Sequence, residues 1–224
     1  MFYNNVTEGI FLERPNRFVA QVLLNGQKEL CHVKNTGRCR ELLLPGAKVI
    51  LEKSENPNRR TQYDLIAVYK GERLINMDSA APNKAAAEFL PKILPEGSVV
   101  RPEVCYKKSR FDFYAETENR KIWIEVKGVT LENDGIVLFP DAPTERGVKH
   151  LNELTQSLEE GYEAWILFVV QMENVKSFMP NDGTHAVFGQ ALRRACAAGV
   201  QVLAYSCQVK PGEMWIQDKV PVCL

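Results

Sequence analysis

The sequence contains no apolar run of about 18 residues or more, so we expect no membrane-spanning helix. Its first residues, MFYNNVTEGI, contain neither the basic segment nor the apolar segment of a secretory signal peptide. These two absences favour a protein of the cytoplasm. The sequence also lacks internal repeats, low-complexity tracts and a flexible linker, so its 224 residues are expected to form one large or two small domains.

Motifs that bind zinc through cysteine and histidine are absent as well. The 6 cysteines include no C-x-x-C pair, and the 3 histidines, His32, His150 and His185, are scattered along the chain. A structural zinc site is therefore not expected. Without a secretion signal, the cysteines are expected to be reduced thiols.

An excess of either charge is also missing. The sequence has 28 Lys and Arg against 28 Asp and Glu, so its formal net charge is zero and its pI is about 6.8. This balance excludes a histone-like protein that coats DNA, which would be strongly basic. A local basic groove is still allowed, because an acidic metal site lowers the total charge.

Residues 1–80 are expected to form an OB-like β-barrel. Two strand-like runs flank Asn25-Gly26, a dipeptide typical of hairpin turns. One short helical turn is expected at CRELLLPG, followed by strands at AKVILEKS and YDLIAVYKGERLINM. Five strands with a short helix between the third and the fourth are typical of an OB fold. A helix at APNKAAAEFLPKIL then leads into the second part of the chain.

Residues 81–224 are expected to form an α/β domain with a mixed central sheet. After a hairpin, strands at GIVLF, AWILFVV and VQVLAYSCQV alternate with helices near residues 143–160 and 184–198. The second and third of these strands are apolar on both faces, which indicates a sheet covered on both sides.

The segment RFDFYAETENRKIWIEVK, residues 110–127, carries the strongest functional signal. It reads as two strands with a tight turn at Glu118-Asn119. In such a hairpin, residues whose numbers sum to 237 stand opposite each other, which places Asp112 across from Glu125 with Cβ atoms about 5 Å apart. Two facing carboxylates repel each other unless a cation lies between them.

A divalent cation, Mg²⁺ or Mn²⁺, is expected to lie between the two carboxylates and offset their repulsion, with Lys127 beside it. Carboxylate oxygens are the ligands that Mg²⁺ prefers, and the Val126 carbonyl is available as a third ligand. In this interpretation Asp112, Glu125 and Lys127 are catalytic, with Lys127 orienting a water near a phosphate. The alternative is a solvated E-x-K ion pair on an exposed strand.

The spacing D-x12-E-x-K resembles the core of the PD-(D/E)XK nucleases. The runs VVRPEVCYKKSRFDFYAE, IWIEVKGVTL, FPDAPTERGVKHLNEL and HVKNTGRCRELLLPGAKV resemble the sugar fermentation stimulation protein A family over nearly the whole chain. The resemblance implies an N-terminal OB-like barrel, a C-terminal nuclease-like domain and DNA as partner. It also points to Glu103 as a further metal ligand, although an exposed glutamate near Lys107 is an equal alternative.

Several basic residues are candidates for DNA binding. Lys107, Lys108 and Arg110 precede the acidic pair and can contact phosphates, as can any solvated basic loop. On the helix that follows Asp141, Arg146 is expected to hold a phosphate with help from Lys149, and His150 is either structural or catalytic. On the barrel, Arg38 and Arg40 follow a tight Asn-Thr-Gly turn and could reach nucleic acid, although a turn with incidental charge is a comparable alternative.

Three functions remain open at this point. The first is a DNA-binding protein with a nuclease-like metal site, and the second is a DNA-binding regulator without catalysis. The third is a module that binds a nucleotide or a small effector through the barrel. Intact Asp112, Glu125 and Lys127 favour the first function over the second.

Overall fold

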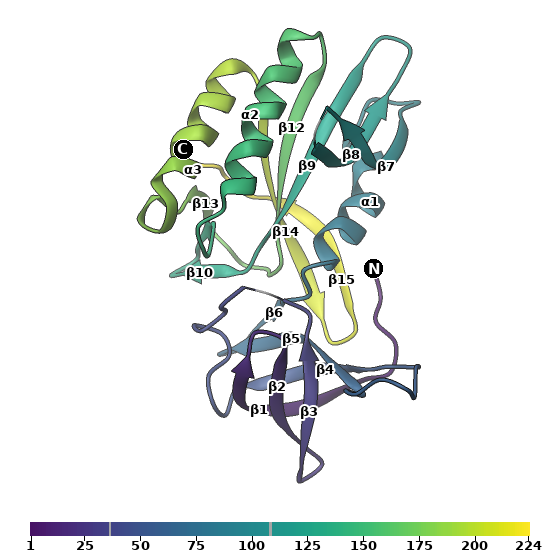
Figure 1. The fold of residues 1–224 in the computed structure, drawn as a ribbon, viewed down its shortest axis with the longest axis vertical. Coiled ribbons are helices and arrows are strands. Elements are labelled where there is room, and N and C mark those ends of the chain that lie inside the picture. Colours follow the sequence, from purple (N-terminus) through teal and green to yellow (C-terminus); the bar gives the residue numbers. More distant parts are fainter. Residues whose placement is uncertain (36, 108) are drawn as a thin grey trace.

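The computed structural model describes residues 1–35, 37–107 and 109–224. A β-barrel lies at one end of the molecule and a larger α/β part at the other (Figure 1). The amino-terminal residues run back from the barrel to the α/β part, where the Met1 amino group donates to the Met214 carbonyl at 2.9 Å. No helix of the described residues is long and apolar enough to cross a membrane.

The barrel consists of six strands in the order β3-β2-β1-β4-β5-β6, and a parallel pairing of β3 with β5 closes it. Five of the strands form the closed barrel, and β6 extends it as a hairpin partner of β5. The Asn25-Gly26 turn joins β2 to β3 with positive φ at both residues, 50° and 81°, as the sequence predicted. The strands are β1 Val6–Asn16, β2 Val19–Leu24, β3 Gln27–Val33, β4 Lys48–Lys53, β5 Tyr63–Lys70 and β6 Arg73–Asn76.

The expected helical turn between β3 and β4 is a single hydrogen-bonded turn. The Leu43 N–H donates to the Cys39 carbonyl at 2.9 Å, and both residues are buried. The turn stops there because Pro45 and Gly46 follow.

The α/β part is built on a mixed sheet in the order β15-β14-β12-β9-β8-β7. The central strands β9, β12 and β14 are parallel, and the outer strands pair antiparallel. A smaller sheet, β10-β11-β13, lies beside it. The elements are α1 Ala81–Ile93, β7 Val99–Tyr106, β8 Ser109–Glu116, β9 Lys121–Val129, β10 Leu131–Asn133, β11 Ile136–Phe139, α2 Glu145–Glu159, β12 Glu163–Val170, β13 Ser177–Pro180, α3 Asp182–Ala198, β14 Gln201–Lys210 and β15 Glu213–Lys219.

Helices cover both faces of this sheet. Helix α1 packs on one face against β9 and β15, while α2 packs on the other against β9 and β12 and also against α3 (Figure 1). Along β12, Trp165 and Leu167 belong to the core on the α1 side, whereas Ile166 and Phe168 belong to the core on the α2 side. The run AWILFVV is apolar throughout because both of its faces are buried, as the sequence predicted.

One expected alternation is wrong. The sequence pattern places Phe111 and Phe113 on one face of β8, but Phe113 packs on the α1 side and Phe111 on the α2 side. The Phe111 ring lies 5.6 Å from the Trp123 ring. The β8–β9 ladder runs only as far as the pair Phe113 and Ile124, whereas β8 stays paired with β7 through Phe111.

Glu132 joins the barrel to the α/β part. Its carboxylate lies 2.7 Å from the Lys70 ammonium group and 2.8 Å from the Arg73 guanidinium group, both on barrel strands. Burial alone would raise the Glu132 pKa, but the hydrogen bonds from Lys70, the Gly135 N–H and Arg73 lower it to about 2.

The Glu132 pairs should make the stability of the protein depend on pH. Because the folded pKa is lowered, the stabilisation is complete above the ordinary pKa of 4.5 and is lost as pH falls toward 2. We expect Glu132→Gln to lower the unfolding free energy at pH 7 by up to about 3 kcal/mol and by much less near pH 2. Urea titrations at both pH values measure this.

The control variant for that titration is Glu163→Gln, which removes a surface pair with Arg120. Exposed pairs contribute little, so this variant should stay within about 1 kcal/mol of the wild type at both pH values. Equal effects of the two substitutions at pH 7 would contradict a special role for Glu132.

Candidate metal centre

The hairpin of β8 and β9 has the predicted register. Phe113 pairs with Ile124, Tyr114 with Trp123 and Ala115 with Ile122, so the paired numbers sum to 237. The Thr117 N–H donates to the Arg120 carbonyl at 2.8 Å and closes the turn at Glu118-Asn119. The carboxylates of Asp112 and Glu125 follow the last pair, at the point where the two strands separate.

Asp112 is held by two hydrogen bonds. Its Oδ2 accepts from the Val126 N–H at 2.8 Å, and its Oδ1 accepts from the Asn83 side chain on α1 at 2.7 Å. Burial raises the pKa of this carboxyl group, and the nearby Glu125 charge raises it further. The hydrogen bonds from Val126 and Asn83 lower the pKa but do not fully offset burial and the Glu125 charge.

Glu125 is 2% exposed, and two side chains contact its carboxylate. Its Oε1 contacts the His150 Nδ1 and the Lys127 ammonium group. Burial raises its pKa, but the His150 hydrogen bond and the Lys127 charge outweigh burial, so the pKa is below its usual value. Glu125 is therefore the more readily ionised member of the pair.

The second oxygen of Glu125 has no partner among the described residues. Oε2 is buried without a hydrogen bond. A buried carboxylate oxygen without a partner is costly, so such an atom usually has a ligand, a water or an ion beside it. This orphan oxygen is the structural feature that best fits a bound cation.

Helix α2 supplies the support behind Glu125. His150 is 3% exposed, and its Nε2 accepts from the Arg146 Nε–H at 3.3 Å. That bond leaves Nδ1 as the donor to Glu125, which fixes the tautomer and the orientation of the ring. Arg146 itself is exposed, so its guanidinium group lies at the surface next to the site. Lys149, one residue before His150, is exposed, and its ammonium group lies 3.7 Å from the largely buried Glu153 carboxylate.

The donor set suits a hard cation that keeps part of its water shell. Asp112 and Glu125 offer carboxylate oxygens, which Mg²⁺ and Mn²⁺ prefer. Within the described residues, no group of three or more His, Cys, Asp and Glu side chains is arranged to hold a metal ion. Two carboxylates supplemented by main-chain oxygen and water match the way Mg²⁺ is usually held.

Glu103, the third predicted metal ligand, does not join Asp112 and Glu125. Its side chain is half-exposed and its carboxylate pairs with the Arg110 guanidinium group at 2.7 Å. Glu103 has a positive φ of 56°, which interrupts the alternation of β7 opposite Asp112. Lys107 pairs with Glu160 at 2.5 Å. Lys108, a predicted DNA contact, is outside the described residues.

The barrel has a basic pocket of its own, of about 430 Å³, which we call the arginine pocket. Arg38 and Arg40, both exposed, line it together with Arg17. Arg14 fixes the loops that line the pocket. Its guanidinium group donates to the carbonyls of Asn35, Gly37, Arg38 and Arg17 at 2.6–2.9 Å. The structure therefore brings together the two predicted arginines and adds Arg14 and Arg17.

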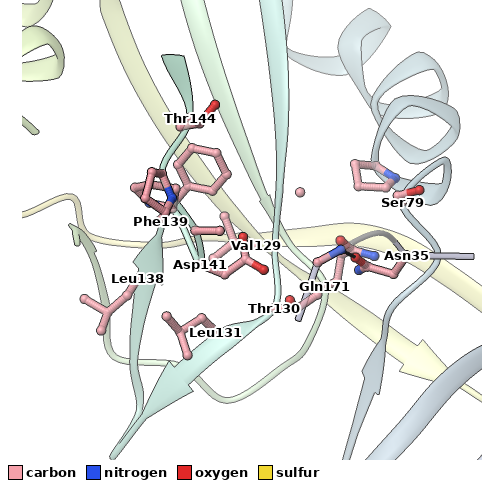
Figure 2. A pocket seen from close by; sticks show the side chains of 16 residues that line it. Asn35, Ser79, Val129, Thr130, Leu131, Leu138, Phe139, Asp141, Thr144 and Gln171 are labelled. Carbon is pink, nitrogen blue, oxygen red and sulfur yellow. Dashed lines mark hydrogen bonds between the residues drawn. The ribbon is translucent and has the colours of Figure 1, made fainter. Parts of the chain in front are cut away.

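A second cleft, of about 330 Å³, lies between the barrel and the α/β part (Figure 2). We call it the interdomain cleft. The loop after β3, the start of α1, the end of β9 and the segment that leads into α2 line it. Asp141 of this cleft was noted in the sequence, whereas Gln171 and the Asp112 partner Asn83 were not predicted. Asn83 lies in the stretch DSAAPNKAAAEF. The one feature of the sequence that pointed to Asn83 was its place at the start of a predicted helix, just before the domain that contains the acidic pair.

Comparisons with known proteins agree with this architecture. A family model described as the sugar fermentation stimulation protein RE domain matches residues 80–213, and one described as the SfsA N-terminal OB domain matches residues 12–77. The chain is 54% identical over 226 residues to the sugar fermentation stimulation protein homologs of Clostridium beijerinckii and of Ruminiclostridium cellulolyticum, with 100% of each chain covered.

A solved structure is similar over the full length. The structure of Pyrococcus furiosus SfsA in complex with Ca²⁺ has a TM-score of 0.88 and 27% sequence identity, covering 100% of this chain and 98% of that chain. The predicted fold, an OB barrel followed by a mixed α/β domain, is confirmed.

Proposed function

The chain belongs to the sugar fermentation stimulation protein family, and we propose that it binds DNA and hydrolyses phosphodiester bonds with the help of Mg²⁺ or Mn²⁺. The observation that carries the proposal is the buried, unpartnered Oε2 of Glu125, whose carboxylate acts electrostatically on Asp112 and contacts Lys127 through Oε1. The Pyrococcus furiosus relative was solved with Ca²⁺, a hard cation with the same preference for oxygen ligands, and this supports a divalent cation here.

Asp112 and Glu125 would hold the cation, which when bound polarises a phosphate and lowers the pKa of water. Asn83 and the Val126 N–H keep Asp112 in place, while His150 keeps Glu125 in place. Lys127 is 16% exposed, so its ammonium group can reach both Glu125 and a phosphate at the surface. There it orients the attacking water and stabilises the charge that develops on the phosphate.

Binding to DNA would rely on local basic groups, since the net charge is zero. Arg146, with Lys149 nearby, lies next to the proposed metal site on α2, and the arginine pocket lies on the barrel. Phosphate contacts from these groups position DNA without reading its sequence.

The arginine pocket should contribute to the salt dependence of DNA binding. We expect Arg38→Ala and Arg40→Ala each to weaken binding and to lower the slope of log affinity against log salt by about one, because each removes one phosphate contact. Fluorescence anisotropy with a labelled duplex at several KCl concentrations measures both quantities.

The matched control for these variants is Arg193→Ala. Arg193 is a half-exposed arginine on α3 that is paired with Asp182, so its removal should leave the slope unchanged. Equal slopes for all three variants and the wild type would argue against the arginine pocket as a DNA contact.

The experiment that tests the proposed function is incubation of the purified protein with single-stranded, duplex and branched DNA in Mg²⁺, Mn²⁺ or EDTA. We expect cleavage of at least one DNA form that requires a metal and is lost in Asp112→Ala. Tight, salt-sensitive binding without any cleavage would instead favour the alternative of a regulator without catalysis. Absence of binding even at low salt would contradict both.

A further inference from the structure

The interdomain cleft and the proposed metal centre are built from the same elements. Helix α1 lines the cleft with Pro82 and holds Asp112 with Asn83, the next residue. Strand β9 carries Lys127 at the metal centre and Gly128 at the cleft. Helix α2 begins at the cleft with its N-cap Thr144 and holds Glu125 with His150. The cleft therefore opens directly beside the metal centre, at the carboxyl ends of β9 and β12 where α/β sheets commonly bind ligands.

The lining of the cleft disfavours a phosphate. The described lining residues include no lysine or arginine, and Asp141 contributes a carboxylate. The apolar part of the lining comes from prolines and from Phe139, Leu131 and Leu138. An uncharged, flat group with apolar faces fits these surroundings better than an anion.

Two polar groups of the cleft, Gln171 and Asp141, present hydrogen-bond acceptors. Gln171 is 2% exposed, and its Nε2 donates to the Asn76 Oδ1 at 3.0 Å and to the Asp78 carbonyl at 3.1 Å. These bonds fix the amide and direct its Oε1 toward Gly128, where an added Cβ would lie only 2.6 Å away. Asp141 enters from the side of β11, and Asn35 and Gln171 stand on the opposite side of the cleft (Figure 2).

Two glycines keep the cleft open. A Cβ at Gly128 would lie 2.6 Å from both Gln171 and Pro82, and a Cβ at Gly37 would lie 2.6 Å from Asp141 Oδ2. The barrel loop therefore approaches Asp141 as closely as its backbone allows. This contact sets the position of the carboxylate at the edge of the cleft.

We propose that the interdomain cleft binds one unpaired nucleobase that carries an amino group, such as cytosine, beside the metal centre. Apolar walls and Phe139 accommodate the faces of the base, and the Asp141 carboxylate and Gln171 Oε1 accept from its N–H groups. Uracil presents carbonyl oxygens on both sides of its single ring N–H, which the acceptors repel. This inference rests on the proposed function, and it specifies unpaired DNA as the substrate at that site.

The test compares two labelled hexanucleotides, dC6 and dU6, by fluorescence anisotropy in EDTA, so that no cleavage occurs. The two differ at the base edge but share a pyrimidine ring and a flexible backbone, so stacking and charge are matched. We expect dC6 to bind about tenfold more tightly than dU6.

Asp141→Asn should remove most of this preference, because an amide can donate to uracil as well as accept from cytosine. Asp134→Asn is the matched control: Asp134 is an exposed aspartate in the β10–β11 turn that does not line the cleft, and its variant should keep the wild-type preference. Melting temperatures of both variants establish that they are folded.

A second measurement separates this inference from the proposed function. Saturation-transfer NMR with free cytidine and uridine reports on the cleft without requiring any affinity for DNA. Cytidine contact that is lost in Asp141→Asn supports the inference even when no DNA is cut. Normal DNA cleavage with equal binding of dC6 and dU6, or a preference that persists in Asp141→Asn, overturns the inference and leaves the proposed function standing.

Discussion

Replacing Asp112 with asparagine should abolish binding of the divalent cation and lower DNA cleavage by about a thousandfold or more. The substitution keeps the size of the side chain and its hydrogen bonds, because the new amide can accept from the Val126 N–H and bond to a reoriented Asn83. What it removes is one of the two charges that would hold the cation. Mn²⁺ titration by calorimetry and a nicking assay measure both effects.

The same substitution should not destabilise the protein in EDTA. Burial and the charge of Glu125 both disfavour ionised Asp112 in the folded state, so a neutral side chain removes a repulsion. We expect the melting temperature of Asp112→Asn in EDTA to equal or exceed that of the wild type, and the rise caused by Mn²⁺ in the wild type to be absent. DNA affinity should rise, because a negative charge near the phosphates is lost.

The control is Asp218→Asn, an exposed aspartate on β15, at the opposite edge of the sheet from β8. It should behave like the wild type in cation binding, cleavage and melting. An Asp112→Asn protein that still binds Mn²⁺ with wild-type affinity would refute the shared site of Asp112 and Glu125.

Replacing Lys127 with alanine should lower the cleavage rate by about 100-fold to 1000-fold while cation binding and most of the DNA affinity remain. The ammonium group contacts Glu125 Oε1, but Glu125 Oε2 does not depend on it. The contribution of Lys127 is expected mainly when charge develops at the phosphate, so it affects the rate rather than the affinity.

Single-turnover cleavage rates and dissociation constants measured on the same preparations test this. Lys121→Ala is the matched control, since Lys121 is an exposed lysine at the start of the same strand. If Lys127→Ala cuts DNA as fast as the wild type, the role assigned to Lys127 is wrong. If its main effect is a loss of DNA affinity, Lys127 is a phosphate contact rather than a catalytic residue.

Local sequence patterns determined the hairpin at the centre of the site. Alternation of apolar and polar residues in β9, together with a tight polar turn, fixed the pairs Phe113 with Ile124 and Tyr114 with Trp123. Because the register of a short hairpin follows from its turn, the proximity of Asp112 and Glu125 was predictable from residue numbers alone. The barrel and the doubly covered central strands were predictable for a similar reason, since their periodicity is local.

Tertiary structure decided how the site is supported and what lies beside it. The bonds from Asn83 to Asp112 and from His150 to Glu125 join residues that are 29 and 25 positions apart, so no local pattern indicates them. The face taken by Phe111 was also set by packing, because the β8–β9 ladder ends at Phe113 and Phe111 joins the core on the α2 side.

The interdomain cleft was the feature that could least be predicted from the sequence. Asn35, Gln171 and Asp141 come from three distant segments, and they meet because the loop after β3 packs against the ends of the central strands. Glu103 illustrates the opposite case. Its position in the sequence suggested a ligand, but a positive φ and the Arg110 guanidinium group place its carboxylate at the surface. Sequence spacing specifies which strand positions face each other, whereas the packing of helices and of the barrel against the sheet decides which side chains complete the site.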